Sequence, residues 1–177
     1  MDPVQIASLE LGKSYQRHHA LVLRTAYRIT GNAADAEDVL QTVFLRLLRR
    51  GPDSAAVVNV GSYLHRAAVN CALDIVRAKL TAVRVPLEEA EPRLAANSPQ
   101  ASGREPAPGE IRQWLRQALA RQSPASAEMF ALRFIEGMDN LAIAEALGTT
   151  AGTVAVTLHR TRGRLQKELR DYLRRGT

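Results

Sequence analysis

The stretch "DNLAIAEALGTTAGTVAVTLHRTRGRL", residues 139–165, contains two helical patterns separated by a short turn. The first pattern ends at Gly148, two threonines follow, and a long helix is predicted from Ala151 to about Leu173. The apolar side of this long helix consists of Val154, Leu158, Leu165 and Leu169. Two helices joined by a tight glycine turn, the second presenting small and basic residues outward, are typical of a helix-turn-helix. A plain helical hairpin has the same spacing, so the pattern alone leaves both structures open.

A further helix is predicted directly before these two. Ser123 is a suitable N-cap, and Pro124 suits the first helical position because its missing N–H would have no partner there. The sequence "SAEMFALRFIEG" then predicts a helix that ends at Gly137. The C-terminal part of the chain is therefore predicted to be a helical module.

The N-terminal half contains "GNAADAEDVLQTVFLRLLRRG", residues 31–51, which predicts an amphipathic helix with Asn32 as its N-cap. Acids occupy the first turns and arginines the last, as the helix dipole favours. The apolar stripe is Ala36, Val39, Leu40, Val43, Phe44, Leu47 and Leu48. The opposite face carries Asp38, Gln41, Thr42 and Leu45. An isolated surface leucine is ordinary, but this face also suits a basic partner with an apolar spot, and both interpretations stay open.

Two more helices are predicted around this one, over Tyr15–Ile29 and over residues 61–80. The core stripe of the second is Leu64, Ala67, Ala68, Cys71 and Ile75. Its polar row is Arg66, Asn70, Asp74 and Arg77. Residues four apart on a helix are neighbours, so this row has two interpretations: it bonds to itself in water, or it contacts exposed bases and phosphates.

Composition predicts an all-α protein of two small domains. The 177 residues include only 5% aromatics and are rich in Ala, Leu and Arg, which favour helices over strands. Lys and Arg minus Asp and Glu give 10 − 7 = +3 for residues 1–80, 3 − 5 = −2 for 81–110 and 11 − 6 = +5 for 111–177. Five of the eight prolines lie in 81–110. We therefore expect a three- or four-helix N-terminal domain, a flexible, acidic, Pro-rich linker and a C-terminal helix-turn-helix domain within these three ranges.

The charge favours a polyanionic partner, and the motifs disfavour an enzyme. The formal net charge is +6 and the isoelectric point is about 10.1, which suits nucleic acid. The tripeptide at residues 12–14, Gly-Lys-Ser, lacks the glycine five positions earlier that a phosphate-binding loop requires. No nucleophile motif or dinucleotide fingerprint occurs. We expect neither a catalytic residue nor a cofactor.

Cysteine, histidine and hydropathy give further expectations. Cys71 has no partner for an internal disulfide and is expected in the core. His18 and His19 point about 100° apart on a helix, so no metal site is expected. The N-terminus has no basic and apolar signal regions, and no run of about 18 apolar residues occurs. We therefore expect a cytoplasmic protein without membrane insertion.

Three segments, "DAEDVLQTVFLRLL", "SYLHRAAVNCALDIVRAK" and "FALRFIEGMDNLAIAEALGTTAGTVAVTLHRTRGRL", resemble in order and spacing the two conserved domains of the extracytoplasmic-function (ECF) sigma factors of bacterial RNA polymerase. The resemblance covers nearly all of the chain outside the N-terminal end and the linker. It implies a subunit that binds core RNA polymerase and promoter DNA and directs promoter recognition and transcription initiation. It also implies an anti-sigma factor as a partner.

The resemblance assigns site residues in three groups. The clamp of the polymerase is expected to dock on Asp35, Glu37, Asp38, Gln41 and Leu45. The proximal (minus-ten) promoter element is expected at Tyr63, Arg66, Asn70, Asp74 and Arg77. The distal (minus-thirty-five) element is expected at Thr150, Gly152, Thr153, Ala155, Val156, Thr157, His159, Arg160, Arg162 and Arg164.

The chain departs from the family at the start of the distal-element helix. Relatives usually carry Lys or Arg, Ser and Arg where this chain has Ala155, Val156 and Thr157, which removes the usual bidentate readers of guanine. Small apolar groups there suit contacts with thymine methyl groups. Two other classes remain: a helix-turn-helix regulator that acts without polymerase, and a sigma-like interaction module that binds a protein and no DNA.

Overall fold

The computed structural model describes residues 3–49, 60–84 and 107–175, with side chains described over 12–49, 60–82 and 107–174. Helices and no strand occur within these ranges, which confirms the all-α prediction. The elements are α1 (Pro3–Thr30), α2 (Ala33–Arg49), α3 (Val60–Arg84), α4 (Pro108–Ala120), α5 (Pro124–Phe130), the π-helix η2 (Ala131–Ile135), α6 (Asn140–Leu147) and α7 (Ala151–Arg175). No single helix of the described ranges has the length and apolar content of a membrane span, although the bent pair α6 and α7 meets that test by length and composition.

The N-terminal domain consists of α1, α2 and α3, which pack against one another. A tight turn joins the first two helices, and Gly31 adopts a φ of 70° in it, a left-handed conformation that favours glycine. Asn32 then begins α2, because its side-chain oxygen accepts a hydrogen bond from the backbone N–H of Asp35 at 3.1 Å. The predicted N-cap is confirmed.

The apolar stripes of α2 and α3 form the core of this domain. The buried residues of α2 are Ala36, Val39, Val43, Phe44 and Leu47. Leu48, predicted in the same stripe, is 47% exposed, because one residue further along the helix turns the side chain about 100° away from α1 and α3. The buried residues of α3 include the predicted Leu64, Ala68 and Cys71 and also Val69, Ala72, Leu73 and Val76. α3 therefore has buried residues on more than one of its sides.

Several helix ends lie beyond the predicted ones. α1 begins at Pro3 and not at Tyr15, α3 continues to Arg84, and α4 begins at Pro108. The first and last residues of the predicted linker, 81–110, are therefore helical, and residues 85–106 lie outside the described residues. The domain boundaries at 80 and 111 stay a prediction.

The C-terminal domain has the predicted N-cap at Ser123, a further cap at Asp139 and one unpredicted helix. Ser123 caps α5 by accepting a hydrogen bond from the N–H of Ser126, and Asp139, which was not predicted as a cap, caps α6 by accepting one from the N–H of Ala142. Gly148 ends α6 with a φ of 62°, and α7 starts three residues later, as predicted. The unpredicted helix is α4, whose Trp114 ring lies 6.1 Å, centroid to centroid, from the Tyr172 ring of α7. The helix-turn-helix is formed by α6 and α7.

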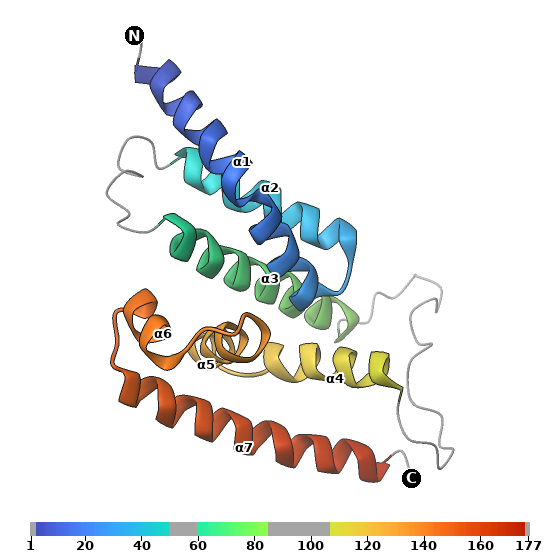
Figure 1. Ribbon diagram of the computed structural model, residues 1–177. Helices are drawn as coiled ribbons and strands as arrows, with labels where there is room; N and C mark the ends of the chain where they lie inside the picture. The colour runs from blue at the N-terminus through green and yellow to red at the C-terminus, as the bar shows by residue number, and fades with distance from the viewer. Residues whose placement is uncertain (1–2, 50–59, 85–106, 176–177) are drawn as a thin grey trace, which may run out of the picture.

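The two domains pack on each other through α3. Figure 1 shows α3 between the α1 and α2 pair and the C-terminal helices, with α7 on the outer side of the molecule. α3 contacts α4, α5, η2 and α6, and α1 contacts η2. At one end of this contact the guanidinium of Arg116, from α4, lies where a side chain at Gly31 would begin. The chain thus forms two helical domains that share an interface along α3.

Candidate nucleic-acid interface

The outer face of α7 carries the residues predicted to contact the distal element. Every one of them is exposed except Thr157, which is half-buried. Thr150 begins the helix: its hydroxyl accepts a hydrogen bond from the N–H of Thr153 at 3.1 Å and lies 2.9 Å from the hydroxyl of that residue. Val156 is 51% exposed. The front of the helix therefore presents small apolar and hydroxyl groups to solvent.

The cations of α7 follow one helical turn later. Arg160, Arg162 and Arg164 are exposed, and none of them forms an ion pair within the described part of the chain. Between them Thr161 is fully buried and donates its hydroxyl to the backbone oxygen of Thr157 at 2.8 Å. The helix thus separates a buried apolar side from a positive outer side. This arrangement suits the neutralisation of DNA phosphates.

The polar row of α3 faces the other domain. The carboxylate of Glu128, on α5, accepts hydrogen bonds from Nε of Arg66 at 3.0 Å and from Nδ2 of Asn70 at 2.9 Å. Nη1 of Arg66 also donates to the backbone oxygen of Ala146 at 2.6 Å. The interpretation that Arg66, Asn70 and Asp74 bond to one another in water is therefore wrong for the first two.

The remaining residues predicted at the proximal element have different surroundings. Nη1 of Arg77 donates to the carboxylate of Asp74 at 3.0 Å, and Nε of Arg77 donates to the backbone oxygen of Ala120 at 3.3 Å. The Asp74 side chain is 64% exposed. Tyr63 is half-buried and packs against the hydrophobic core. The structure therefore brings Arg66, Asn70 and Arg77 together at the domain interface.

A second carboxylate crosses the same interface. Glu136, which ends η2, accepts hydrogen bonds from Oγ1 of Thr25 at 2.9 Å and from Nε2 of His65 at 2.6 Å, and Nη1 of Arg28 lies 3.7 Å away. Burial of Glu136 opposes ionisation, but the hydrogen bonds from His65 and Thr25 and the charges of His65 and Arg28 outweigh it and lower the pKa of this carboxyl. Glu136 is therefore held ionised against two helices of the N-terminal domain.

The residues predicted to dock on the polymerase lie on α2. Glu37, Asp38, Gln41 and Leu45 are exposed, the last with 51% of its surface. Asp35 differs, because both of its carboxylate oxygens accept hydrogen bonds from Nζ of Lys79 on α3, at 2.6 and 2.7 Å. Its side chain is only 14% exposed.

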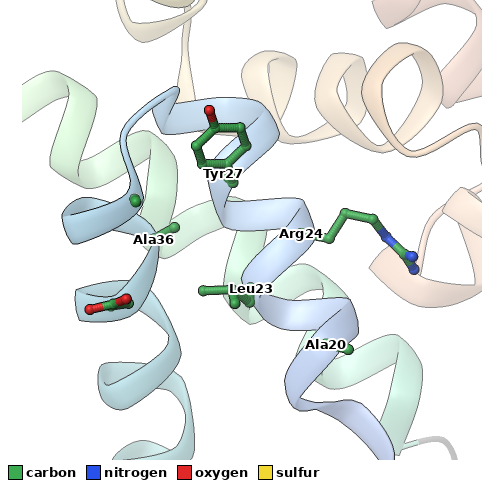
Figure 2. A pocket seen from close by; sticks show the side chains of 7 residues that line it. Ala20, Leu23, Arg24, Tyr27 and Ala36 are labelled. Carbon is green, nitrogen blue, oxygen red and sulfur yellow. The ribbon is translucent and has the colours of Figure 1, made fainter.

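An apolar groove lies beside this face, between α1 and α2 (Figure 2). Its lining consists of Ala20, Leu23, Arg24, Tyr27, Ala33, Ala36 and Glu37. Tyr27 is 54% exposed there, and Figure 2 shows the Arg24 side chain directed away from α2. The groove therefore extends the acidic face of α2 with apolar surface.

Comparisons with known proteins match this arrangement. The family description Sigma-70 region 2 matches residues 14–80, and Sigma-70, region 4 matches residues 112–165. The RNA polymerase sigma-E factor of Streptomyces coelicolor is 31% identical over 161 residues, and the alignment covers 91% of this chain and 86% of that protein. The chain belongs to the ECF sigma factor family. The ECF RNA polymerase sigma factor SigE of Mycolicibacterium smegmatis is 33% identical to this sigma factor, covering 89% of this chain but 59% of that protein.

A solved structure supports the fold of the sigma factor. It is CnrH in complex with the cytosolic domain of CnrY, with a TM-score of 0.54 and 21% identity, and it covers 96% of this chain and 99% of that chain. At this identity the likeness concerns the fold alone. The region 2 match covers most of α1 together with α2 and most of α3, and the region 4 match ends within α7.

Sequence reasoning missed the interface acids of the sigma factor. The sequence pattern places Glu128 and Glu136 inside a predicted helix and predicts no role for them or for His65. A signal was present for Glu128, because it stands within "SAEMFALRF", among residues that helical spacing buries. A buried carboxylate requires a partner, and that requirement predicts a contact without naming the partner.

Proposed function

We propose that this sigma factor binds core RNA polymerase, recognises promoter DNA and directs transcription initiation. The single observation that carries the proposal is the outer face of α7, the second helix of a helix-turn-helix, which presents small groups followed by exposed cations to solvent. Membership of the ECF sigma factors supports the same function. No enzymatic role is part of it.

Distal-element recognition is assigned to α7. Thr150, Gly152 and Thr153 form the start of the helix, which approaches DNA with backbone N–H groups. Ala155 and Val156 offer methyl groups that suit thymine. The binding energy comes largely from phosphate neutralisation by the arginines that follow, with His159 beside them. This division predicts weak discrimination between bases at the front of the helix.

Proximal-element binding is assigned to the polar row of α3. Arg66, Asn70 and Arg77 supply donors for phosphates and base edges, and Tyr63 supplies an aromatic ring. Asp74 holds Arg77 by an ion pair three residues away on the same helix. In the present arrangement the donors of Arg66 and Asn70 are engaged by the C-terminal domain.

Polymerase docking is assigned to the acidic face of α2. Asp38, Gln41 and Leu45 are exposed along one side, and Glu37 connects them to the apolar groove. Asp35 acts through Lys79, which orients it, and contributes less directly. We infer that the protein acts in the cytoplasm, where polymerase and DNA are, and that an anti-sigma factor binds it there.

The test is reconstitution with purified core RNA polymerase. The sigma factor is expected to bind core polymerase in a pull-down and to support run-off transcription from promoters of the genes that its overexpression induces. Asp38→Lys is expected to weaken polymerase binding by about 2–5 kcal/mol, because a reversed charge leaves its partner unpaired. Glu145→Lys, the same charge change at an exposed position of α6, is the control.

Three results would contradict the proposal in different ways. Failure of the wild-type protein to bind core polymerase, together with binding to duplex DNA, indicates a helix-turn-helix regulator. Binding to neither indicates an interaction module for another protein. Full polymerase binding by Asp38→Lys removes the docking role from α2 and leaves the rest of the proposal intact.

A further inference from the structure

Two arginines of α4 lie together beside the turn that joins α1 and α2. The guanidinium of Arg116 lies where a side chain at Gly31 would begin. Arg112 stands one helical turn earlier on the same side of α4 and is exposed. Burial and then the charge of Arg112 lower the pKa of Arg116, so the two cations are close enough to repel each other. The turn therefore has a pair of like charges beside it.

No acid of the described chain neutralises this pair. Nε of Arg116 is buried and has no hydrogen-bond partner among the described residues. No ion pair within those residues includes Arg112 or Arg116. By contrast, Arg66 and Arg121 each pair with a carboxylate far away in sequence. A buried donor of a charged group is costly without a partner, so the pair suits an anion from outside the described chain.

The C-terminal end of α1 does not account for both charges. The end of a helix carries a partial negative charge of about half an elementary charge. Arg28 already occupies the last turn of α1, where its Nη1 lies 3.7 Å from the carboxylate of Glu136. Arg116 makes a further contact with this end, and a second arginine four residues before it on α4 repels it and is unfavourable for the helix. Arg112 is therefore the residue that indicates a ligand.

Tyr27 joins the arginine pair to the apolar groove between α1 and α2. It stands one turn before Gly31 on α1, and its phenol opposes the lowering of the pKa of Arg116 by burial and by Arg112. Its ring lines the groove and is 54% exposed. Figure 2 shows this ring at one end of the groove, with its hydroxyl directed away from Leu23. The groove and the two cations are therefore parts of one surface.

The two parts of this surface suit the two halves of a nucleotide. Guanidinium groups bind phosphate oxygens through paired hydrogen bonds, and a tyrosine hydroxyl supplies a further donor. The groove includes the small apolar side chains of Ala20, Ala33 and Ala36, which leave room for a planar base against the exposed ring. Glu37, also in the lining, accepts hydrogen bonds from amino or ribose hydroxyl groups and repels phosphate. Charge thus sets the orientation of the ligand.

We propose that Arg112, Arg116 and Tyr27 bind the phosphates of a purine nucleotide whose base lies in the groove between α1 and α2. A purine is the larger base and covers more of the groove. The site combines α1 of the N-terminal domain with α4 of the C-terminal domain. None of these three residues belongs to the surfaces assigned to promoter DNA or to polymerase, so the site does not depend on the proposed function.

The test is isothermal titration calorimetry of the full chain with ATP, and with tripolyphosphate and adenosine as its separate halves. The variants are Arg112→Ala, Arg116→Ala and Arg116→Lys. Arg170→Ala is the matched control, because it removes the same charge from an exposed position of the basic helix α7. Circular dichroism reports whether each variant keeps its helix content.

The wild type is expected to bind ATP about tenfold more tightly than tripolyphosphate, because the base adds a stacking contact. Arg112→Ala and Arg116→Ala are each expected to weaken ATP binding about tenfold, which corresponds to the loss of one charge-assisted contact. Arg116→Lys is expected to recover only part of that loss, because lysine keeps the charge and lacks the planar fork. Arg170→Ala is expected to bind ATP like the wild type.

Three outcomes overturn the proposal. Equal ATP affinity of the wild type and Arg112→Ala shows that the pair is not a phosphate site, and because Arg112 is exposed a loss of folding does not obscure this result. An equal loss in Arg170→Ala shows general attraction of a polyanion to a basic protein. Tripolyphosphate that binds as tightly as ATP shows that the groove holds no base. None of these results bears on the proposed function, which is tested by polymerase binding and run-off transcription.

Discussion

α3 and α7 both carry a row of polar and basic side chains, yet the two rows have opposite environments. On α3, Arg66 and Asn70 donate to a carboxylate of the other domain, and Arg77 donates to a backbone oxygen there. On α7, Arg160 and Arg164 point to solvent and have no ion-pair partner among the described residues. The row on α7 is thus exposed, whereas the row on α3 is already engaged by the other domain. Sequence pattern does not separate the two cases, because both rows lie opposite an apolar stripe.

The difference has a functional consequence for the order of binding. An exposed row of cations attracts duplex DNA at long range and depends strongly on salt. A covered row responds only after the cover is removed, so its apparent affinity is reduced by the fraction of open molecules. Duplex distal-element DNA is therefore expected to bind the free protein more readily than the single strand of the proximal element.

The largest effect is expected when the charge of the covered row is reversed. Arg66→Glu places a carboxylate against Glu128 and should weaken domain closure by about 2–5 kcal/mol, toward the lower end because the Arg66 side chain is 38% exposed. The measurement is the radius of gyration by small-angle scattering. Arg160→Glu makes the same charge change on α7 and should leave the radius as in the wild type. Equal effects of the two changes would remove the distinction between the rows.

A smaller effect on domain closure is expected when the pH is lowered. The pKa of Glu136 is lowered in the closed protein, so its ionised form favours closure. This contribution is complete above the ordinary pKa of a carboxyl, about 4.3, and is lost as the pH falls through the lower value of the closed state. The facing groups are Thr25, Arg28 and His65.

Scattering as a function of pH measures this acid response. The wild type should begin to separate only in the acid range, whereas Glu136→Gln should lack that step and be more open near neutral pH. Circular dichroism distinguishes domain separation from unfolding. Identical profiles for both proteins would show that Glu136 does not control closure.

The smallest effect concerns the exposed row. Arg160→Ala should weaken binding to duplex distal-element DNA and lower the slope of log affinity against log salt by about one unit, because one phosphate contact is lost. Ala155→Lys on the same face should raise the slope by a similar amount and strengthen binding across sequences. If Arg160→Ala instead abolished discrimination at one base pair by about 1–3 kcal/mol with an unchanged slope, this arginine would read a base.

The predicted features that the structure confirms depend on neighbours close in sequence. Asn32 and Ser123 each cap a helix by accepting a hydrogen bond from the backbone N–H three residues later in the chain. Gly148 ends α6 because it adopts a left-handed conformation. The buried stripes of α2 and α3 follow from helical periodicity in the same way. Such signals are complete within one helix and need no knowledge of the fold.

The features that were missed depend on pairs far apart in sequence. Glu128 and Asn70 are 58 positions apart, and Glu136 and Thr25 are 111 apart. Residues Ala131–Ile135 were predicted as helix, but not their π-helical form, which ends directly before Glu136. Patterns within one helix thus predicted the polar row of α3 but not Glu128, the residue of the other domain that Arg66 and Asn70 contact.

The turn at Gly31 in the N-terminal domain is in contact with Arg116 of the C-terminal domain, so substitutions at the two positions are expected to be coupled. A side chain at this position would have its Cβ within 2.3 Å of Nη2 and Cζ of Arg116, and the φ of 70° disfavours any L-residue with a Cβ. The clash with Arg116 arises from the contact between domains, whereas the positive φ arises from the turn itself. Truncation of Arg116 would remove only the clash. The cost of a mutation at position 31 is therefore expected to be non-additive with one at 116, so the two sites are expected to constrain each other's substitutions across related sequences.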